Sequence, residues 1–516
     1  MKKLLSALLV LLTLAMVGWG LSRPSREARR AADLFARTSD SRQYKRTVTI
    51  WGDDWLGYLV LRSPRFAHAL ADHDIGVRWE MEPDFEKRFA GLRDGKCDFV
   101  AATLDSYLAN GNATGWPGAI TWVIDESYGG DAVLAGDSVK NLDDLNRAGT
   151  RGAFVGLSPS EFLLRSEISH FHLDRLRAGL EKSRVDNVET AYNALHHKRA
   201  DFAVLWEPFV TRAKNEIPGA HVLIDTREAQ GLIIDIALAR RQLLDTDPAL
   251  VQTVTRAYFE AMHDYLNHAA AFTDAAAHDS GKGTVDAETM LRGIRFDTLN
   301  DNVQDWLSES HDHEARLAVS VGQIRAVLRD HQQRIDLPND DANAILYRGI
   351  IQAVGRQPAG IADVSGGAAK RPDANTRQLG QYYPSLSPAQ WEALLGQVRG
   401  TLLDEPIVFQ PGQTEIPEDF QSSIRDAAPK LANYPSFRVV VEAHVSPGES
   451  AEADRALSEA RALEVKRFLA AECGVPEDRV LARGKGSAEP PQRYPGETDS
   501  AWTRRARRAR IYLVGQ

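Results

Sequence analysis

The sequence predicts an α/β protein with two similar lobes, followed by a small α+β module. At 516 residues the chain is too long for one ordinary core, so two or three domains are expected. Strands and helices alternate in the same order twice before residue 210. A stretch without periodicity then separates this part from a third set of alternating elements near the C-terminus.

Composition and charge limit the classes of function. Hydrophobic residues make up 43% of the chain and charged residues 26%, which is typical of globular proteins. The net charge of −9 argues against nucleic acid as a partner, because phosphate binding needs a basic surface. The two cysteines, Cys97 and Cys473, fall in different predicted domains, so we expect no disulfide framework.

We expect neither a metal site nor a cofactor. The histidine pairs His196 with His197 and His311 with His313 lack a second pair of ligands at zinc-like spacing. An enzyme is not expected either, because no nucleophile, base and orienting group stand at recognisable positions.

Residues 1–30 are expected to form a signal peptide or an N-terminal membrane anchor. The uncharged run over residues 4–22 would cover about 28 Å as a helix, which suits either role. No clear small-x-small cleavage site ends the run, so an uncleaved anchor is the preferred interpretation. Arginines follow the run and by themselves favour the cytoplasm, so the orientation depends on what the later domains do.

One pattern is written twice in the chain. LRDGKCDFVAATLDSY and LHHKRADFAVLWEPF each have Leu, five residues, Asp-Phe, a short apolar run and an acidic and aromatic tip. Each pattern ends a predicted lobe, with strands at 47–52, after 76 and at 97–103 in the first and at 152–157, 185–189 and 200–208 in the second. Ligands bind beyond the carboxyl ends of such strands, so we expect both tips to face one cleft.

Several short motifs in this part resemble one family when taken in order. WGDDWLGY, GKCDFVAATLDSY, ESYGGDAVLA, NLDDL, GLSPSEFLL and DFAVLWEPF are similar to motifs of the periplasmic substrate-binding proteins of the nitrate, sulfonate, taurine and thiamine-precursor type. The resemblance covers about residues 47–261. It implies a two-lobed periplasmic-binding-protein fold that closes on a small solute and delivers it to an ABC permease. We assign residues 45–355 to this unit, and apolar periodicity predicts that its last part, from 240, is helical.

The candidate ligand-binding residues lie at the ends of predicted strands, at the expected crossover between lobes and at one helix start. They are Trp51, Trp55, Asp105, Ser106, Ser127, Asp131, Ser158, Ser160, Trp206 and Glu207. Three of them have a plain alternative: Trp51 in the core, Asp131 in a turn, and Ser158 as a helix cap that forms a capping box with Glu161.

The charge of the residues expected to line the cleft indicates which kind of ligand would bind there. Its residues are acidic or aromatic, and no Arg or Lys stands ready to pair with a sulfonate or nitrate. This favours a cationic or neutral heterocyclic solute. The helix start at Ser158 favours an anionic solute instead, because exposed N–H groups attract anions. The sequence leaves the solute open.

Residues 356–378 are predicted to be a linker, 379–402 a connecting helix and 403–516 a small βαβαβ module. One long helix of the module places Arg461 within the apolar stripe of Leu457, Val465 and Phe468. A guanidinium in that position is costly unless paired, so we expect a carboxylate partner from the chain or from a ligand.

The module resembles the OmpA-like peptidoglycan-binding domain. The segments IVF, EAHVS, DRALSEARALEV and ARRA match the motifs of that family in order. The resemblance implies that the module binds the diaminopimelate carboxylate and amine of peptidoglycan stem peptides, with Arg461 holding the carboxylate in a bidentate pair.

The module also departs from the family pattern. Ser446 stands where the family has the aspartate that grips the ligand, Asp454 replaces an asparagine, and Ala506 replaces another. Asp454 offers a partial replacement for the lost charge. Altered binding, ordinary binding and a different partner all stay open. Arg507 and Arg508 belong to a basic run that is either a solvated strand face or a contact for an anionic polymer.

Both resemblances belong to the bacterial cell envelope. They favour a periplasmic solute-binding protein of ABC-transporter type, anchored in the inner membrane by its N-terminal segment and tethered to peptidoglycan. The alternative is a structural protein that links the inner membrane to peptidoglycan, with a degenerate or sensory ligand-binding unit.

Overall fold

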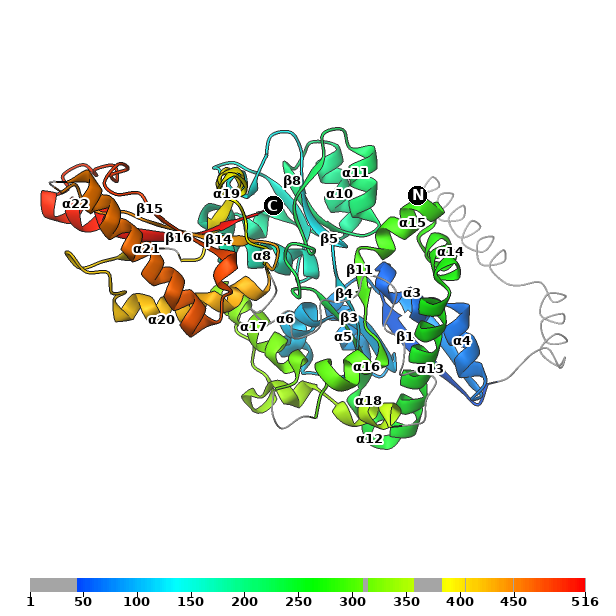
Figure 1. Cartoon of the computed structure of the whole chain (residues 1–516). Coiled ribbons are helices and arrows are strands. Elements are labelled where there is room, and N and C mark those ends of the chain that lie inside the picture. Colours follow the sequence, from blue (N-terminus) through cyan, green and yellow to red (C-terminus); the bar gives the residue numbers. More distant parts are fainter. Residues whose placement is uncertain (1–43, 310–313, 357–382, 404, 449, 516) are drawn as a thin grey trace, which may run out of the picture.

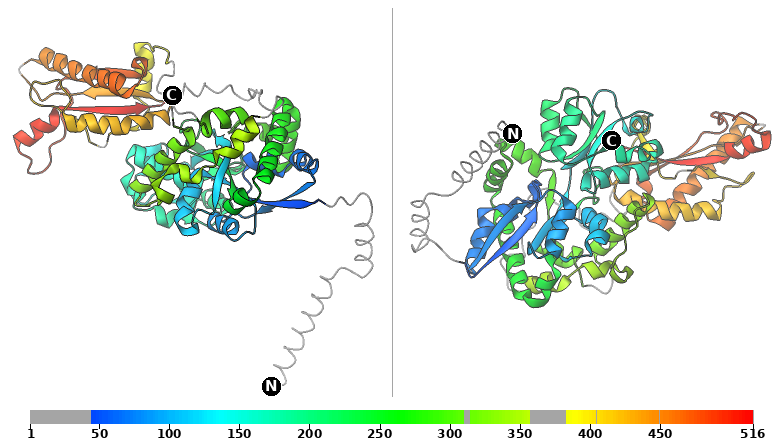
Figure 2. Two further views of the ribbon diagram at one scale, coloured as in Figure 1. Left: turned by 90° about the horizontal axis from the view of Figure 1, so that it is seen from below. Right: turned by 180° about the vertical axis from the view of Figure 1, so that it is seen from behind.

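The computed structural model describes residues 44–309, 314–356, 383–403, 405–448 and 450–515. Two α/β lobes lie against each other, and the C-terminal module projects from one end of them (Figure 1 and Figure 2). The predicted N-terminal anchor, most of the predicted linker, and His311 with His313 lie outside the described residues. Within the described residues no helix is both long and apolar enough to cross a membrane.

Lobe 1 is a six-stranded sheet in the order β11-β4-β10-β3-β1-β2. Its strands are β1 (Arg46–Gly52), β2 (Ile75–Met81), β3 (Phe99–Thr103), β4 (Gly118–Ser127), β10 (Ile234–Arg240) and β11 (Ile294–Phe296). The first three strands are parallel, as predicted, whereas β10 runs antiparallel between β3 and β4. The sheet is covered by helices that include α4 (Pro64–Ala71), α5 (Phe85–Arg93) and α6 (Leu104–Thr114).

Lobe 2 is a five-stranded sheet in the order β7-β6-β8-β5-β9. Its strands are β5 (Asp131–Ala135), β6 (Gly152–Val155), β7 (Arg184–Val185), β8 (Phe202–Trp206) and β9 (His221–Asp225), and its main helices are α8 (Pro159–Phe171), α10 (Val188–His196) and α11 (Phe209–Glu216). The strand predicted over 185–189 is shorter than expected. Asn187 caps α10 through the Thr190 N–H, so the chain turns into helix there.

The repeated pattern has the same structural role in each lobe. The Asp98 carboxylate accepts a hydrogen bond from the Thr49 N–H at 3.1 Å, and the Asp201 carboxylate accepts one from the Arg151 N–H at 2.9 Å. Each aspartate ties the start of the strand that follows it to a parallel neighbour, which is β1 in lobe 1 and β6 in lobe 2. The repeated pattern therefore supports one pair of parallel strands in each lobe.

Two crossovers connect the lobes, one between β4 and β5 and one between β9 and β10. The Thr226 hydroxyl joins them, because it accepts from the Gly129 N–H at 2.7 Å and lies 2.8 Å from the Ser127 Oγ. The Ser127 N–H donates to the Ile233 carbonyl at 3.1 Å. The crossovers are thus paired side by side where the lobes meet.

The part predicted to be helical consists mainly of helices. They include α13 (Pro248–Asn267), α14 (Ala269–Ser280), α15 (Thr284–Leu291), α17 (Arg316–Asp330) and α18 (Arg348–Gly355). Helix α13 packs on α4 and α18 beside lobe 1, whereas α17 contacts both α6 of lobe 1 and α8 of lobe 2.

The C-terminal module is a sheet in the order β12-β16-β14-β15, with β13 also paired to β16. Its elements are α19 (Pro388–Leu395), β12 (Val398–Thr401), β13 (Ile407–Val408), α20 (Glu418–Ala427), β14 (Arg438–Ala443), α21 (Ala451–Cys473), β15 (Val480–Gly484), α22 (Asp499–Ala506) and β16 (Arg508–Val514). The expectation of a helix alone over 379–402 was incomplete, because β12 adds an edge strand to this sheet.

The module packs on lobe 2 through α8. The ring of Phe171 lies 5.4 Å from the ring of Tyr434, and the Tyr434 hydroxyl donates to Glu167 Oε1 at 3.1 Å. Asn433 and Gln230 exchange hydrogen bonds of 2.9 and 2.7 Å across the same junction.

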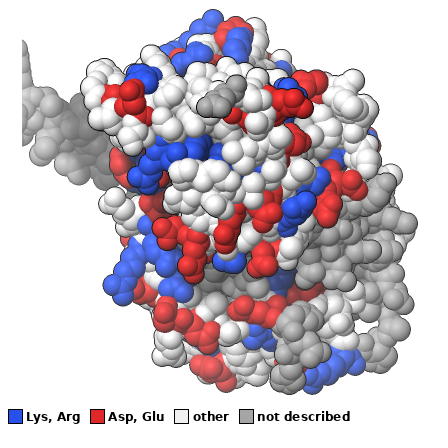
Figure 3. All heavy atoms as spheres, turned by 60° about the vertical axis from the view of Figure 1, so that its left-hand side comes forward, with Lys and Arg blue, Asp and Glu red and all other residues white. Residues whose placement is uncertain are grey.

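Basic and acidic side chains are interspersed over the molecular face that Figure 3 shows, so neither sign of charge dominates that face.

Candidate functional site

The facing edges of the two lobes enclose a small cavity. Its lining comes from both lobes and from the second crossover, and consists of Asp53, Trp55, Tyr58, Phe85, Thr103, Asp131, Pro159, Trp206, Ile233 and Asp235. Its free volume is about 20 Å³, which is room for about one water molecule. The tips of the two lobes therefore meet, as predicted, but the closed lobes leave almost no space between them.

A larger cavity of about 710 Å³ lies elsewhere, between lobe 2, α17 and the C-terminal module. Charged groups on its wall pair with each other, as Arg177 does with Asp330 at 2.9 Å. The larger cavity lies at the junction of lobe 2 with the C-terminal module, and none of the predicted ligand-binding residues lines it. We therefore take the smaller cavity as the candidate ligand site.

Three of the predicted residues line the small cavity: Trp55, Asp131 and Trp206. Trp55 can lie there because Gly130 has no side chain, since a Cβ atom on Gly130 would stand 2.4 Å from the indole ring. Trp206 enters the cavity from lobe 2, and its indole Nε1 has no hydrogen-bond partner among the described residues.

The predicted serines are engaged by the chain itself. The hydroxyls of Ser106, Ser158 and Ser160 donate to the carbonyls of Thr103, Val155 and Val204, at 2.8, 2.7 and 3.3 Å respectively. Ser127 is held by Thr226 in the crossovers. These hydroxyls support the turns that carry the site, and none of the four serines lines the small cavity.

Trp51 and Glu207 have positions that do not support the predicted ligand contact. The Trp51 indole N–H donates to Glu80 at 2.8 Å, and its ring packs against Gly91 of α5. Both carboxylate oxygens of Glu207 accept from Thr211, at 3.0 and 2.8 Å, and so hold the start of α11.

The start of α8 also differs from its prediction. The Ser158 side chain makes no capping hydrogen bond, and Glu161 accepts from the Leu157 N–H at 2.8 Å and pairs with Arg184. The predicted capping box is therefore absent. Glu161 lines a pocket of this region together with Asp105, so carboxylates occupy the helix end that was expected to attract an anion.

Two buried carboxylates of the site escaped the sequence analysis. Asp125 on β4 and Asp235 on β10 are register partners in neighbouring strands. The Trp55 indole N–H donates to Asp125 at 3.3 Å, and the Tyr58 hydroxyl donates to Asp235. One signal was present: charges interrupt apolar runs at both places, Asp125 with Glu126 in WVIDES and Asp235 alone in GLIIDIALA.

Burial raises the pKa of several carboxyls at or near the cavity. The pKa of Asp131 rises to about 7, with Glu207 and Asp53 adding to the effect of burial. The pKa of Asp105 rises to about 8, again through burial and with a contribution from Asp131. Burial also raises the pKa values of Asp125 and Asp235 far above the usual range, and each of these charges disfavours its neighbours.

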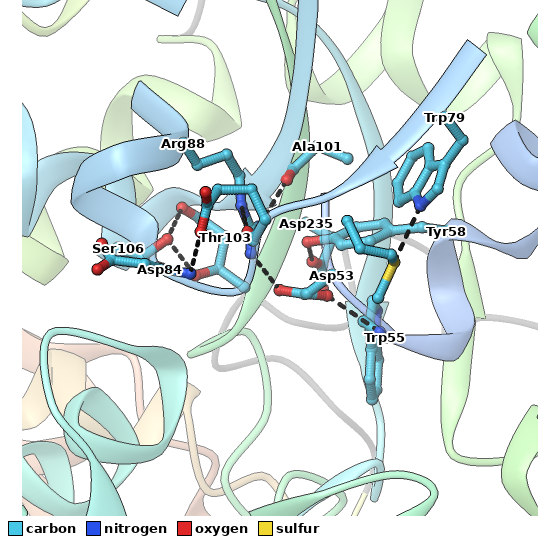
Figure 4. Close-up of polar contacts among 12 residues, drawn as sticks. Asp53, Trp55, Tyr58, Trp79, Asp84, Arg88, Ala101, Thr103, Ser106 and Asp235 are labelled. Carbon is cyan, nitrogen blue, oxygen red and sulfur yellow. Dashed lines mark hydrogen bonds and ion pairs between the residues drawn. The ribbon is translucent and has the colours of Figure 1, made fainter. Parts of the chain in front are cut away.

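Two arginines stand close behind the cavity, and the chain itself engages both. Arg62 donates to the carbonyls of Asp53 and Trp55, at 2.9 and 3.0 Å, and pairs with Asp279. Arg88 of α5 is 0% exposed and pairs with Asp53 at 2.8 Å. Its other N–H groups donate to the carbonyls of Ala101 and Glu82 at 2.9 and 2.8 Å, and Figure 4 shows it reaching toward Asp53 and Ala101. It neutralises Asp53 and does not line the cavity.

Arg461 of the C-terminal module is also buried, but its partners are not those predicted. Its N–H groups donate to the carbonyls of Gln413, Gln410 and His444, at 2.8, 3.1 and 3.4 Å. Within the described part of the chain no carboxylate pairs with it, because the segment after β13 folds over it and supplies carbonyl oxygens instead. Burial and Arg507 lower its pKa to about 10.

The other predicted residues of the module lie around Arg461. The Asp454 carboxylate accepts from the Gly448 N–H at 3.0 Å, and so fixes the loop that carries the half-buried Ser446. Arg507 donates to the Phe409 carbonyl at 3.2 Å and Arg508 to the Glu489 carbonyl at 3.0 Å. Backbone carbonyls thus hold Arg461, Arg507 and Arg508 in place.

Residues 408–506 match the family model of the OmpA family. The C-terminal module is an OmpA domain. Among solved structures, the peptidoglycan-associated lipoprotein of Burkholderia pseudomallei matches 21% of this chain and 90% of its own, with 21% identity and a TM-score of 0.19.

Several solved structures match the larger part of the chain. The match to the periplasmic aliphatic sulphonate binding protein SsuA of Escherichia coli covers 58% of this chain and 98% of the SsuA chain, with 16% identity and a TM-score of 0.45. The alkanesulfonate-binding protein SsuA of Xanthomonas axonopodis pv. citri, bound to MOPS, covers 60% and 97%, with 16% identity and a TM-score of 0.44. No curated protein matches the sequence of this chain.

Proposed function

We propose that the chain is a periplasmic solute-binding protein that its OmpA domain holds at the cell wall. The observation that carries this proposal is the cavity between the lobes, where Asp131 Oδ1 has no hydrogen-bond partner among the described residues. Asp105 Oδ1, close behind, is equally unpaired. Unpaired buried polar atoms cost free energy, so a solute that pairs with them stabilises the closed lobes.

The paired crossovers supply the hinge of this mechanism. Opening there separates lobe 1 from lobe 2 and admits the solute, and closure buries it against both tips. In this proposal an ABC permease accepts the solute, and the apolar run over residues 4–22 anchors the chain in the inner membrane.

A structural link between membrane and wall is the second candidate. It is favoured by the small volume of the cavity, about 20 Å³, which the chain's own side chains have almost filled. In that case the lobes act as a spacer and bind nothing.

Removal of any bound solute separates the two candidates. The chain is purified under native conditions, and half of it is unfolded in urea, dialysed and refolded. A solute-binding protein should lose Tm on stripping and regain it when the dialysed small molecules return, by mass action. Equal Tm values for both samples, with no response to the small molecules, would support the spacer.

Sedimentation with purified peptidoglycan sacculi tests the wall contact. Arg461→Ala should abolish retention of the full chain on sacculi. Arg479→Ala is a matched control, because Arg479 is buried in the same domain and also donates to backbone carbonyls, those of Phe437, Leu431 and Tyr434. Equal retention of both variants, measured below their Tm values, would remove Arg461 from the wall contact.

A further inference from the structure

We infer that the solute held between the lobes is a small organic cation. This inference rests on the proposed function and adds the chemical class of its ligand. The charged residues that line the cavity are Asp53, Asp131 and Asp235, and among the described residues its wall includes no Lys, Arg or His. A sulfonate or nitrate would find no cationic partner there, whereas an ammonium or guanidinium group would find several carboxylates.

Two of these carboxylates are buried and have a free oxygen. Asp131 and Asp235 are each 1% exposed, and neither Asp131 Oδ1 nor Asp235 Oδ2 has a hydrogen-bond partner within the described part of the chain. Acceptor oxygens in this state bind N–H donors strongly, because no water competes with the ligand.

The local charges do not cancel without a ligand. Asp53 is already neutralised by Arg88, and its other oxygen accepts from the Trp55 N–H at 3.0 Å. Among the described residues, none of Asp105, Asp131, Asp125 and Asp235 forms an ion pair with Lys or Arg, so these carboxyls have no cationic partner. The raised pKa of Asp131, about 7, shows how a proton takes this place when the cavity is empty. A bound cation displaces that proton.

The remaining wall favours an organic cation over a metal ion. Trp55, Tyr58, Phe85 and Trp206 contribute aromatic rings to the cavity. Figure 4 shows two of these rings, Trp55 and Tyr58, next to Asp53 and Asp235. Aromatic faces attract ammonium and guanidinium groups through the ring quadrupole. No group of three His, Cys, Asp or Glu side chains in the described residues is arranged to hold a metal.

Calorimetric titration of the urea-stripped full chain tests the charge of the ligand. The cationic probes are methylammonium, tetramethylammonium, choline and methylguanidinium, and the anionic probes are methanesulfonate and nitrate. We expect at least one cation to bind with proton release near pH 7, and the anions to show no heat of binding.

Three variants locate the binding. Asp131→Asn and Asp235→Asn should each weaken the cation by about tenfold or more, because each removes a buried negative partner. Asp245→Asn removes the same charge from an exposed position on a distant helix and should leave the affinity unchanged.

The possible outcomes separate this inference from the proposed function. Binding of methanesulfonate or nitrate without any cation would overturn the cationic assignment and leave the solute-binding role intact. A cation whose affinity is unchanged in Asp131→Asn and Asp235→Asn would bind elsewhere and would also overturn it. If no probe binds, the cationic assignment is overturned as well. The stripping experiment alone then decides whether the chain binds a solute.

Discussion

Asp125 and Asp235 are two adjacent buried carboxyls, and their burial costs free energy of folding. Their pKa values are raised by burial and by each other, so the folded chain must hold a proton that the unfolded chain releases above pH 4. Asp125→Asn replaces that proton with a fixed N–H and keeps the oxygen that accepts from Trp55. We expect the free energy of unfolding to rise by about 1–3 kcal/mol at pH 8 and less at pH 5, measured with urea. Asp245→Asn is the control, and an equal loss of stability at both pH values would contradict the pairing.

Three further buried carboxyls make the stability of the folded chain depend on pH. Burial raises the pKa values of Asp105 and Glu167 to about 8 and that of Asp131 to about 7. The unfolded chain has lost these protons above pH 4, while the folded chain keeps them up to pH 7–8. Stability contributed by these groups therefore falls as pH rises from about 4 to about 8.

Three histidines act in the opposite direction at lower pH. Burial lowers the pKa of His170 to about 3 and the pKa values of His331 and His444 to about 4. The unfolded chain therefore takes up protons below the ordinary value near 6.5, and stability falls as pH drops. Above about pH 7.5 these histidines are neutral in both states, whereas the folded chain still loses carboxyl protons, so the urea midpoint should decrease between about pH 7.5 and 8.5. A midpoint that stays constant would show that the three carboxyls are ionised in the folded chain.

The sequence predicted part of the candidate site. Trp55, Asp131 and Trp206 were found because they follow strands or a glycine-rich crossover, where ligand residues occur in α/β proteins. Asp125 and Asp235 were missed because their meeting depends on β10 entering lobe 1 next to β4, from a place far along the chain. Arg461 was found to be unusual, but the carbonyls that hold it come from loops that no periodicity predicts.

At the scale of elements, the two crossovers depend on one hydroxyl. Thr226 Oγ1 accepts from the Gly129 N–H and pairs with Ser127 Oγ, both in the other crossover. Thr226→Val keeps the shape but leaves these buried groups unpaired. It should lower the free energy of unfolding by about 1–3 kcal/mol in thermal or urea unfolding. Thr226→Ser retains the hydroxyl and should cost clearly less, and equal losses would assign the effect to the methyl group instead.

The strands with strong periodicity could be predicted from the sequence, whereas the edge strand β12 of the C-terminal module was missed. Strands such as β1, β3 and β8 are apolar runs bounded by turns, so their type and order could be predicted. Strand β12 is short and contains Gly400, which reads as a turn. The structure explains this glycine: a Cβ atom there would lie 2.2 Å from Phe171, because β12 packs directly on α8.

At the scale of the molecule, α8 joins the candidate ligand site to the OmpA domain. Its first residue, Pro159, lines the cavity between the lobes. Its last turns carry Glu167, His170 and Phe171, which contact Tyr434 of the OmpA domain. Buried apolar residues form one continuous cluster across this junction. The lobes and the OmpA domain are therefore expected to unfold as one cooperative unit.

A single substitution at the junction tests this cooperativity. Phe171→Ala removes the ring that packs on Tyr434 and Phe437, and should cost about 3–5 kcal/mol. Because the lost contacts hold two units together, calorimetry should show one transition in the wild type and two in the variant. Phe66→Ala is the control, since Phe66 is equally buried but lies on α4 of lobe 1, far from the junction. It should lower Tm and keep a single transition. If Phe171→Ala also unfolds in one transition, other contacts couple the units, such as the exchange between Asn433 and Gln230.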